Sequence, residues 1–500
     1  MIKSVEVKAP QALEVALRHF RKGNLLKATQ TIERIIESVP DFADAHRLLA
    51  QVSIQKKDHT RALRAARNAV SLSPDRAVCY LTLASTLENV GEHQEAETIL
   101  LRALEIEDND AEIYFMLGNN YKIQGKLNDA EHAYRAAINL QPKFSSSLKN
   151  LGTVLREQGS LIKALDLYQK AQAIDPGDHE AHWNESLTLL SLGRDADGWE
   201  KFDHGFAVGV RQPREFGRPK WRGERLQDKT IVVYAEQGAG EHILYTNAVP
   251  HLVAISGRVV IESSRRMSRL LDRSFPEAVV YARGDPPHPD LCTDAIDYQT
   301  AAGSVFQYIG HPPFPEARTP LLVPDPDLTQ QKRQRYEDTY PGKLKVGLSW
   351  QSTNVEVGKQ KSVDLSVLAS ILNKPEIGLV SLQYGKRIEE LSALQNETGI
   401  QVYEDYSVDQ LRNLDAFAAQ VSALDLIITI SNTTAHMAGA LGKETWVMLP
   451  LVPHYYWHCE GDSTPWYPTV RVFRQQTLGD WKQVLAAVDR ALSYRISCND

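Results

Sequence analysis

Residues 125–142 read GKLNDAEHAYRAAINLQP, and residues 159–176 read GSLIKALDLYQKAQAIDP. The second stretch begins 34 residues after the first, and glycine, alanine, tyrosine and proline recur at the same places in both. The period continues through the first part of the chain, where one position holds Pro40, Pro74, Asp108, Pro142 and Pro176. A fixed period of this length is typical of proteins built from stacked structural repeats.

Three further positions recur with the same period. One holds Ala28, Ala62, Ala96, Ala130 and Ala164, and another holds Ala16, Ala50, Ala84, Gly118 and Gly152. The third holds Gly23, Lys57, Gly91, Gly125, Gly159 and Gly193, with lysine as the single exception. Small residues are needed where two helices cross closely, glycine ends or turns a helix, and proline starts the next unit. The pattern therefore predicts pairs of helices.

This pattern resembles the tetratricopeptide repeat (TPR), with about five units from Ala9 to Asp178. A degenerate sixth unit, about residues 179–205, lacks the final proline and is interpreted as a cap. Stacked repeats bind polypeptides on their concave face, so we expect a protein partner there. The alternative is that the solenoid only rigidifies or dimerises the protein, and the oligomeric state stays open.

Composition and charge exclude several classes of protein. The 500 residues include 56 Lys and Arg against 63 Asp and Glu, a net charge of −7 that argues against nucleic-acid binding. No apolar run approaches the roughly 20 residues of a membrane span, and the first residues do not form a secretion signal. The four cysteines are widely spaced, without a CxxC pair, so neither a zinc site nor a disulfide framework is indicated. We expect a cytoplasmic protein.

The periodicity changes at about Trp221, where short apolar runs begin to alternate with helical stretches. These runs are residues 230–234, 258–261, 278–281, 346–350, 379–382, 426–430 and 446–449. Proline-rich stretches at 285–289 and 312–326 are interpreted as loops. Continuous apolar strands of this kind predict parallel sheets covered on both faces. We therefore expect a solenoid over 1–205, a linker over 206–221, and two Rossmann-like domains over 222–342 and 343–500.

Ligands of such sheets lie beyond the carboxyl ends of the strands. The strongest candidate loop joins the run at 426–430 to a helix rich in small residues, and its polar residues are Ser431, Asn432, Thr433, Thr434 and His436. Hydroxyl and amide side chains at a helix start suit an anionic diphosphate. The alternative is N-capping by Ser431 or Thr433, which needs no ligand.

Two further loops carry candidate residues. The loop after Trp350 is polar, with Ser352, and its Lys359 and Lys361 would neutralise a leaving phosphate; the alternative is a pair of solvated lysines.

In the segment 236–242, Gly238 and Gly240 would let the backbone approach a ligand. Glu241 or His242 would take a proton from an acceptor hydroxyl, whereas the alternative for Glu241 is dipole compensation at a helix start.

Four segments occur in an order that resembles bacterial TPR-fused glycosyltransferases. They are VGLSW at 346–350, SLQYG at 381–385, the stretch 431–442, and 465–475 with its PWYP and RVFRQ motifs. Those enzymes are similar to lipopolysaccharide heptosyltransferases and to O-linked N-acetylglucosamine transferases. The resemblance implies a GT-B fold, in which the second Rossmann-like domain holds most of a nucleotide-sugar donor.

Site residues follow from the resemblance at matching positions. It implies that Thr433, Thr434 and His436 lie at the donor phosphates, that Lys361 is the basic residue before the Ser-apolar-Leu run, and that Glu241 matches the acid of the glycine loop. Gln383 and Tyr384 of the second motif are further donor-binding candidates. The chain departs from its relatives in two places, because they commonly have Asp where this chain has Glu241 and often have Asp-Thr at 431–432.

The resemblance implies an inverting transfer of sugar to a Ser or Thr hydroxyl of a protein. The nucleotide-sugar would be a substrate, without a cofactor, and no metal is expected because no Asp-x-Asp motif stands at a strand end. Some relatives glycosylate flagellin, which makes flagellin one acceptor to consider. The alternative is a partner-recruiting TPR scaffold with an inactive GT-B domain.

Overall fold

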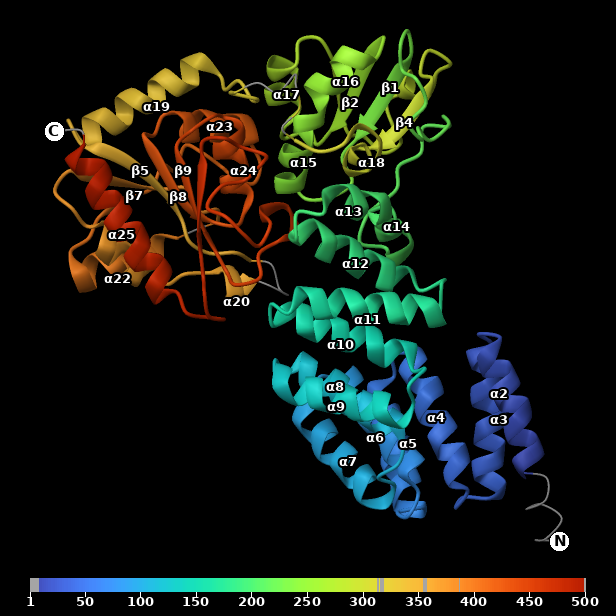
Figure 1. Cartoon of the computed structure of the whole chain (residues 1–500). Helices are drawn as coiled ribbons and strands as arrows, with labels where there is room; N and C mark the ends of the chain where they lie inside the picture. The colour runs from blue at the N-terminus through green and yellow to red at the C-terminus, as the bar shows by residue number, and fades with distance from the viewer. Residues whose placement is uncertain (1–8, 313, 315–318, 354–357, 386, 499–500) are drawn as a thin grey trace. The chain divides into compact units, whose positions relative to one another are not determined.

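The computed structural model describes residues 9–312, 314, 319–353, 358–385 and 387–498 (Figure 1). Contacts divide the chain into two compact units, with the boundary between Ala181 and His182. The first unit is helical, and the second contains two parallel sheets with their helices. An all-helical repeat region is therefore followed by an α/β region.

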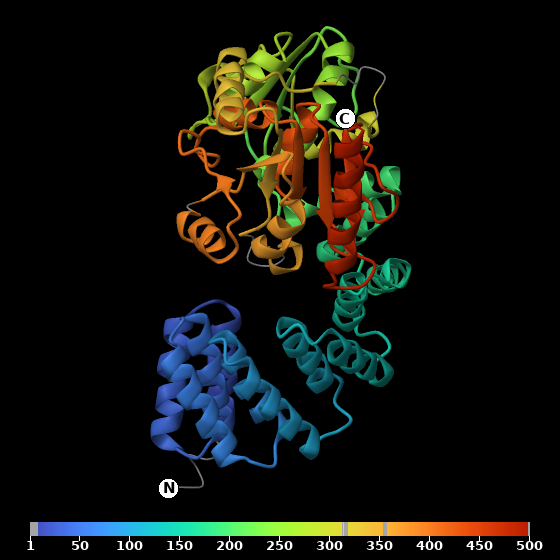
Figure 2. The ribbon, with the colours of Figure 1, turned by 90° about the vertical axis from the view of Figure 1, so that its left-hand side faces the viewer.

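The first unit is a series of helix pairs, which lie side by side in Figures 1 and 2. Among the described residues these are α2 (Ala9–Arg21) with α3 (Leu25–Ser38), α4 (Ala43–Gln55) with α5 (His59–Leu72), α6 (Ala77–Asn89) with α7 (His93–Ile106), α8 (Ala111–Ile123) with α9 (Leu127–Leu140), and α10 (Ser145–Glu157) with α11 (Leu161–Ile174). The first helix of each pair begins 34 residues after the first helix of the pair before it. The predicted repeats are confirmed.

The turn inside each pair contains one residue with a left-handed backbone. The φ angle is positive at Gly23, Gly91, Gly125 and Gly159, and Lys57 adopts the same conformation with a φ of 60°. A positive φ is uncommon for a residue with a side chain. The lysine that interrupts the glycine pattern therefore preserves the turn, and the period continues through it.

Two glycines of the repeat make room for tyrosine rings. A Cβ atom at Gly118 would lie 2.5 Å from Cε1 of Tyr134, and one at Gly152 would lie 2.7 Å from Cε1 of Tyr168. At the corresponding places of the preceding pair, Ala84 and Leu100 are both completely buried in the same core. This position of the repeat therefore holds glycine where a tyrosine ring packs against it and alanine where the corresponding side chain is leucine.

The segment that follows the repeats folds with the α/β unit. Helix α12 (His179–Ser191) is followed by α13 (Asp195–Lys201) and α14 (His204–Val208). Trp183, Trp199 and Phe202 are buried in the same hydrophobic core as the strands of the first sheet. The sequence placed residues 179–205 in the solenoid, but these large side chains are covered by the α/β core.

Residues 206–221 are packed as well, although the sequence assigned them to a linker. Arg211 is completely buried, and its Nη2 donates hydrogen bonds to Glu236 at 2.8 Å and to Ser304 at 2.9 Å. The buried Trp221 donates its backbone N–H to the carbonyl of Gln299 at 2.9 Å. The segment is fixed because the charge of Arg211 and the backbone of Trp221 both have partners in the half of the α/β unit that holds the first sheet.

The first sheet has strand order β3-β2-β1-β4, and its pairings are parallel. Its strands are β1 (Thr230–Tyr234), β2 (Arg258–Ser263), β3 (Val279–Ala282) and β4 (Tyr298–Ala301). Its helices are α15 (Ala239–Tyr245), η1 (Thr246–Ala248), α16 (Val249–Ile255), α17 (Ser268–Ser274), η2 (Pro289–Cys292), η3 (Ala302–Ser304) and α18 (Phe306–Ile309). The three strands predicted here are confirmed, whereas β4 was missed.

The second sheet has strand order β10-β9-β8-β5-β6-β7 and is also parallel. Its strands are β5 (Leu344–Ser349), β6 (Ile377–Ser381), β7 (Val402–Tyr403), β8 (Leu426–Ile430), β9 (Thr445–Leu449) and β10 (Val470–Arg474). The helices are α19 (Pro326–Thr339), α20 (Gly358–Lys361), α21 (Leu365–Leu372), α22 (Ile388–Thr398), α23 (Leu414–Ser422), α24 (Thr433–Ala440), η4 (Tyr455–Trp457) and α25 (Lys482–Ser497). The four strands predicted here are confirmed, and β7 and β10 were missed.

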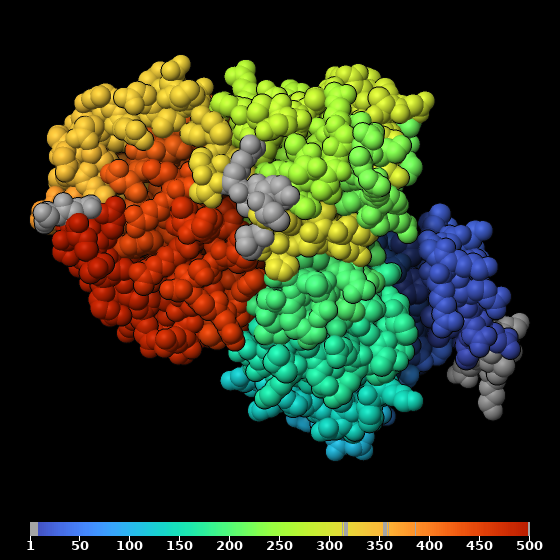
Figure 3. Space-filling model, turned by 45° about the horizontal axis from the view of Figure 1, so that its top comes forward, coloured from blue at the N-terminus to red at the C-terminus, as the bar shows by residue number. Residues whose placement is uncertain are grey.

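Helices lie along the second sheet, and α25 runs beside its strands in Figure 2. The central strands β8 and β9 are buried along their whole length. Residues of this half appear in orange and red as one continuous surface in Figure 3. The predicted parallel α/β architecture, with strands buried on both faces, is confirmed.

Candidate functional site

Loops from both sheets of the α/β unit meet at one pocket of about 380 Å³. It lies where β1, β5 and β8 end and lead into α15, α20 and α24, the position expected for ligands of parallel sheets. The sequence-predicted residues in its lining are Gly240, Glu241, Ser352, Lys361, Tyr384, Ser431, Asn432, Thr433, Thr434 and His436. The three loops chosen from the sequence therefore converge.

Asn432 caps the helix that borders the pocket. Its Oδ1 accepts hydrogen bonds from the backbone N–H groups of Thr434 at 3.0 Å and Ala435 at 3.4 Å, while its Nδ2 donates to Ser349 at 2.8 Å. Ser431 instead accepts a hydrogen bond at 2.8 Å from the ring nitrogen of Trp457. The suggested cap at Ser431 or Thr433 is wrong, because the amide of Asn432 occupies that position.

His436, on the first turn of α24, is completely buried and lies in the pocket wall. Its ring stacks on Trp457, with 5.2 Å between centroids, and contacts Tyr456 edge-on at 4.7 Å. Burial, together with the nearby charge of Lys361, lowers the pKa of His436 to about 3. The imidazole is therefore neutral near pH 7.

Glu241 lies in the first turn of α15, half-buried in the pocket lining. Burial raises the pKa of its carboxyl group, whereas its own backbone N–H and the charge of Lys361 lower it. A Cβ atom at Gly238 would lie 2.8 Å from Oε2 of Glu241. Gly238, which does not line the pocket, thus makes room for this carboxylate and does not bring the backbone to a ligand.

Lys361 ends the short helix α20 and is buried in the pocket wall. Burial lowers the pKa of its ammonium group, and the carboxylate of Glu241 raises it. A Cβ atom at Gly358 would lie only 2.6 Å from the carbonyl oxygen of Ser352, so glycine lets α20 return close to the loop after β5. The side chain of Lys359 lies outside the described residues.

Gln383 holds the loop after β5 through side-chain hydrogen bonds and does not line the pocket. Its Oε1 accepts hydrogen bonds from the backbone N–H groups of Trp350 and Gln351, both at 2.9 Å, and its Nε2 donates to the carbonyl of Gln351 at 3.0 Å. Tyr384 does line the pocket, and its hydroxyl accepts the N–H of Thr353 at 2.7 Å. Gln383 is therefore a support for the pocket loop.

His242 is buried beside the pocket but is not part of its lining. Burial, with the charge of Arg266, lowers its pKa to about 4. The sequence offered Glu241 and His242 as alternative bases, and the structure brings Glu241 alone of these two into the pocket. The reason is helical geometry, because consecutive residues on α15 point about 100° apart.

Sequence reasoning missed several residues of the pocket. These are Ala239, Arg266, Thr353, Leu382, Gln410, Leu411, Leu414, Phe417 and Tyr456. Arg266 follows β2, and its Nη1 donates to the carbonyl of Leu411 at 2.9 Å. The pair Arg265-Arg266 after a predicted strand was a usable signal, because charged residues at strand ends mark this edge of the sheet. The apolar residues carried no such signal.

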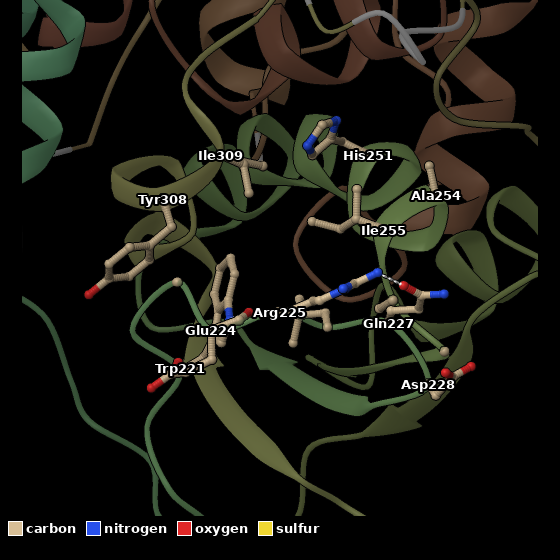
Figure 4. A pocket seen from close by; sticks show the side chains of 14 residues that line it. Trp221, Glu224, Arg225, Gln227, Asp228, His251, Ala254, Ile255, Tyr308 and Ile309 are labelled. Carbon is tan, nitrogen blue, oxygen red and sulfur yellow. Dashed lines mark hydrogen bonds between the residues drawn. The ribbon is translucent and has the colours of Figure 1, made fainter.

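A larger pocket of about 680 Å³ lies elsewhere on the first sheet's half (Figure 4). Trp221, Tyr308 and His251 lie around it, and residues 223–228 lead from it into β1. It therefore lies toward the amino end of β1, opposite the edge where the predicted residues meet. Its size does not make it the better candidate, since it contains none of those residues.

The described ranges bear on metal ligands and on membrane-spanning helices only through their own side chains and helices. No group of three or more His, Cys, Asp or Glu side chains was found there that could hold a metal ion. None of the helices in the same ranges combines the length and the apolar character needed to cross a membrane.

Comparison with known proteins identifies the repeats directly. Two family models, both described as tetratricopeptide repeat, match residues 13–77 and 115–179 and residues 53–119. Protein FlbA of Caulobacter vibrioides is 30% identical over 329 residues, which cover 61% of this chain and 53% of that protein. The chain thus spans about half the length of this relative. The likeness extends into the α/β unit, because 61% of 500 residues exceeds the 181 residues of the first unit.

Solved structures to which the chain is similar include PilW, described as a widely conserved type IV pilus biogenesis factor. It is 20% identical, with a TM-score of 0.38 over 40% of this chain and 92% of that one. MamA is 22% identical, with a TM-score of 0.30 over 32% of this chain and 95% of that one. The helical array itself, together with the two family models, shows that the N-terminal part of this chain consists of tetratricopeptide repeats.

Proposed function

We propose that the α/β unit is a GT-B glycosyltransferase that moves a sugar from a nucleotide-sugar to a Ser or Thr hydroxyl of a protein. The observation that carries the proposal is the convergence of Glu241 from the first sheet with Lys361, Thr433 and His436 from the second in one pocket. A carboxylate, a cation and helix-start hydroxyl groups are the parts needed for transfer to a hydroxyl with release of a phosphate.

The donor diphosphate would lie against the start of α24. Thr433 is half-buried and Thr434 is buried there, and Lys361 and Arg266 supply positive charge on the pocket wall. Cations and the positive end of a helix both favour an anionic ligand. The apolar wall formed by Leu382, Leu414 and Phe417 would contact the uncharged parts of the donor.

Glu241 would act as the general base. Burial raises the pKa of its carboxyl group, which makes the carboxylate a stronger base than one in water. In the transfer step, the acceptor oxygen forms a bond to the anomeric carbon and its proton passes to Glu241. The bond between that carbon and the phosphate oxygen breaks, and the nucleoside diphosphate leaves with the electron pair. Lys361 would stabilise the negative charge of this leaving group.

The repeats would supply the acceptor. Tetratricopeptide repeats stack into extended concave surfaces suited to polypeptides. We therefore propose that the repeat unit holds the protein to be modified, with flagellin as the first acceptor to test. The reaction would take place in the cytoplasm, and the nucleotide-sugar would serve as a substrate with no separate cofactor.

A donor screen followed by a transfer assay tests the proposal. Thermal unfolding of the whole chain is measured with UDP-, GDP-, ADP- and CMP-sugars, and a bound donor at 100-fold above its Kd should stabilise the protein by about 2.7 kcal/mol. Lys361→Met should weaken this effect, whereas Lys374→Met, which removes a lysine paired with Asp489 outside the pocket, should not.

Transfer of labelled sugar to flagellin or to another captured acceptor completes the test. Donor binding without hydrolysis or transfer would favour a catalytically inactive domain that serves as a partner-recruiting scaffold. Absence of binding by every donor would contradict the proposed activity itself.

A further inference from the structure

One nitrogen of the buried His436 ring has no protein partner. Its Nδ1 lies 3.3 Å from the hydroxyl oxygen of Tyr467, whereas its Nε2 has no hydrogen-bond partner in the part of the chain that the structure describes. The ring is completely buried and forms part of the pocket wall. Leaving a buried polar atom unpaired costs about 1–3 kcal/mol. A hydrogen bond from this nitrogen to a ligand in the pocket would remove that cost.

The partners of Tyr467 determine which nitrogen carries the proton. The side-chain amide of Asn247 donates to the carbonyl of Leu244 at 2.8 Å, and its presence near the phenol lowers the pKa of Tyr467 against the larger effect of burial. Nδ1 of His436 is the acceptor that the described residues offer to the phenol proton of Tyr467. A neutral imidazole that accepts at Nδ1 carries its own proton on Nε2.

Packing holds this arrangement in place. A Cβ atom at Gly439 would lie 2.5 Å from Cγ of Tyr467, so the phenol ring packs directly on α24 one turn after His436. The imidazole of His436 also stacks on the indole of Trp457 with an interplanar angle of 17°, and this contact restricts rotation of the imidazole ring. Asn247 belongs to η1 beside the first sheet, whereas Tyr467 and His436 belong to the second. The hydrogen bond joins Tyr467 to His436 within the second half, and Asn247 acts on Tyr467 from the first half.

We propose that Tyr467 is a positioning residue that fixes His436 with its Nε2–H directed into the pocket, where this group donates a hydrogen bond to a diphosphate oxygen. The identity of the ligand rests on the proposed function, whereas the position of the proton does not. Lys361, Glu241 and Arg266 already place charges around this space. A neutral donor adds a directed hydrogen bond without adding a further charge.

Selective ¹⁵N labelling of histidine tests the position of the proton in the whole chain. Long-range ¹H–¹⁵N correlation spectra distinguish a protonated Nε2 from a protonated Nδ1, and the His436→Gln variant identifies the signal by its loss. The expected result is a protonated Nε2 in the wild type and a mixture of both neutral forms in Tyr467→Phe. Tyr455→Phe is the matched control, because it removes a buried hydroxyl that pairs with Tyr245 at 2.6 Å.

Binding of UDP, GDP and ADP by the wild type, Tyr467→Phe and Tyr455→Phe supplies the second readout. The nucleoside diphosphate that binds the wild type should bind Tyr467→Phe about tenfold more weakly, since a hydrogen bond to a charged group is strengthened by a fixed donor. Tyr455→Phe should bind it normally. A protonated Nδ1 in the wild type would overturn the proposal, as would an unchanged spectrum and affinity in Tyr467→Phe. If no nucleoside diphosphate binds, the proposed function and the diphosphate contact both fail, and the spectra alone decide the proton position.

Discussion

A Cβ atom at position 240 would lie 3.0 Å from Cδ2 of His436. Glycine at this place therefore permits α15 of the first sheet to pack directly on α24 of the second. The same contact brings Glu241, the next residue, into the pocket that α24 borders. The sequence singled out the glycine loop at 236–242 and the start of α24 separately, and the structure places them in direct contact.

Gly240→Ala should separate the two helices by a few tenths of an ångström and disturb the pocket. Overpacking of this kind costs about 1–3 kcal/mol, so we expect a lower Tm of the α/β unit and weaker binding of the nucleotide-sugar. Calorimetry and donor titration measure the two effects. Gly177→Ala is the control, since its Cβ atom would meet its nearest neighbour at an ordinary 3.4 Å. Equal behaviour of the two variants would show that close packing at Gly240 is unimportant.

Glu241→Gln should abolish base catalysis while keeping the shape of the side chain. Loss of a general base lowers the rate by about 10²–10⁴-fold, and donor affinity should be largely preserved. The measurement is transfer of labelled sugar together with donor affinity. Glu389→Gln, which changes an exposed glutamate at the start of α22, should transfer normally. Normal transfer by Glu241→Gln would reject this residue as the base, and the structure offers no support for His242 in its place.

Asp405→Asn should destabilise the α/β unit in a pH-dependent way. Burial raises the pKa of Asp405, but hydrogen bonds from Lys332 and Ser407 outweigh it and lower the pKa to about 2 from an ordinary 3.8. A depressed carboxyl pKa contributes stability that is present above the unfolded-state pKa and lost as pH falls through the folded-state pKa. This difference corresponds to about 2 kcal/mol.

The loss in Asp405→Asn should therefore be full at pH 7 and shrink between about pH 4 and pH 2. Urea unfolding at a series of pH values measures it. Asp294→Asn, at a fully exposed aspartate, should show no comparable loss. A loss that is constant over this range would point to packing alone. The residue matters for the site because Ser407 and Asp405 anchor the segment that leads to Gln410 and Leu411 in the pocket.

Gly118→Ala should destabilise the repeat unit, because the added methyl group would lie 2.5 Å from the ring of Tyr134. The cost is about 1–3 kcal/mol, measured by thermal unfolding of the whole chain. The double variant Gly118→Ala with Tyr134→Leu should recover much of this loss, since it reproduces the Ala84 and Leu100 combination of the preceding pair. The single variant Tyr134→Leu completes the comparison. A loss in the double variant equal to the sum of the losses in the two single variants would show that the two positions are energetically independent.

A fragment of residues 179–500 should fold, whereas a fragment of 206–500 should not. The shorter fragment loses Trp199 and Phe202, which are buried in the core of the first sheet, and each such side chain contributes about 1.5–3 kcal/mol. Cooperative thermal unfolding and near-ultraviolet circular dichroism distinguish the two fragments. An equally high Tm of the shorter fragment would show that residues 179–205 do not stabilise the core.

Some features of the pocket depended on contacts that no local pattern contains. Gln383 was predicted to bind the donor because it stands in a motif, but its amide is used by the backbone of Trp350 and Gln351. Strand β4 was missed because it contains Gln299, a polar residue that is buried only because its side chain accepts the N–H of Phe216 at 2.9 Å. Polar residues of this kind are stabilised by partners far away in the sequence.

The sequence by itself determined the features that depend on periodicity. The 34-residue period predicted the helix pairs, and seven apolar runs predicted strands, because a helix crossing or a buried strand needs the same residue types at regular intervals. Only the tertiary structure decided that Trp199 and Phe202 pack with the α/β core, that Glu241 and not His242 reaches the pocket, and that Tyr467 contacts His436. These outcomes depend on which side chains meet through space, and sequence spacing does not encode such contacts between separate elements.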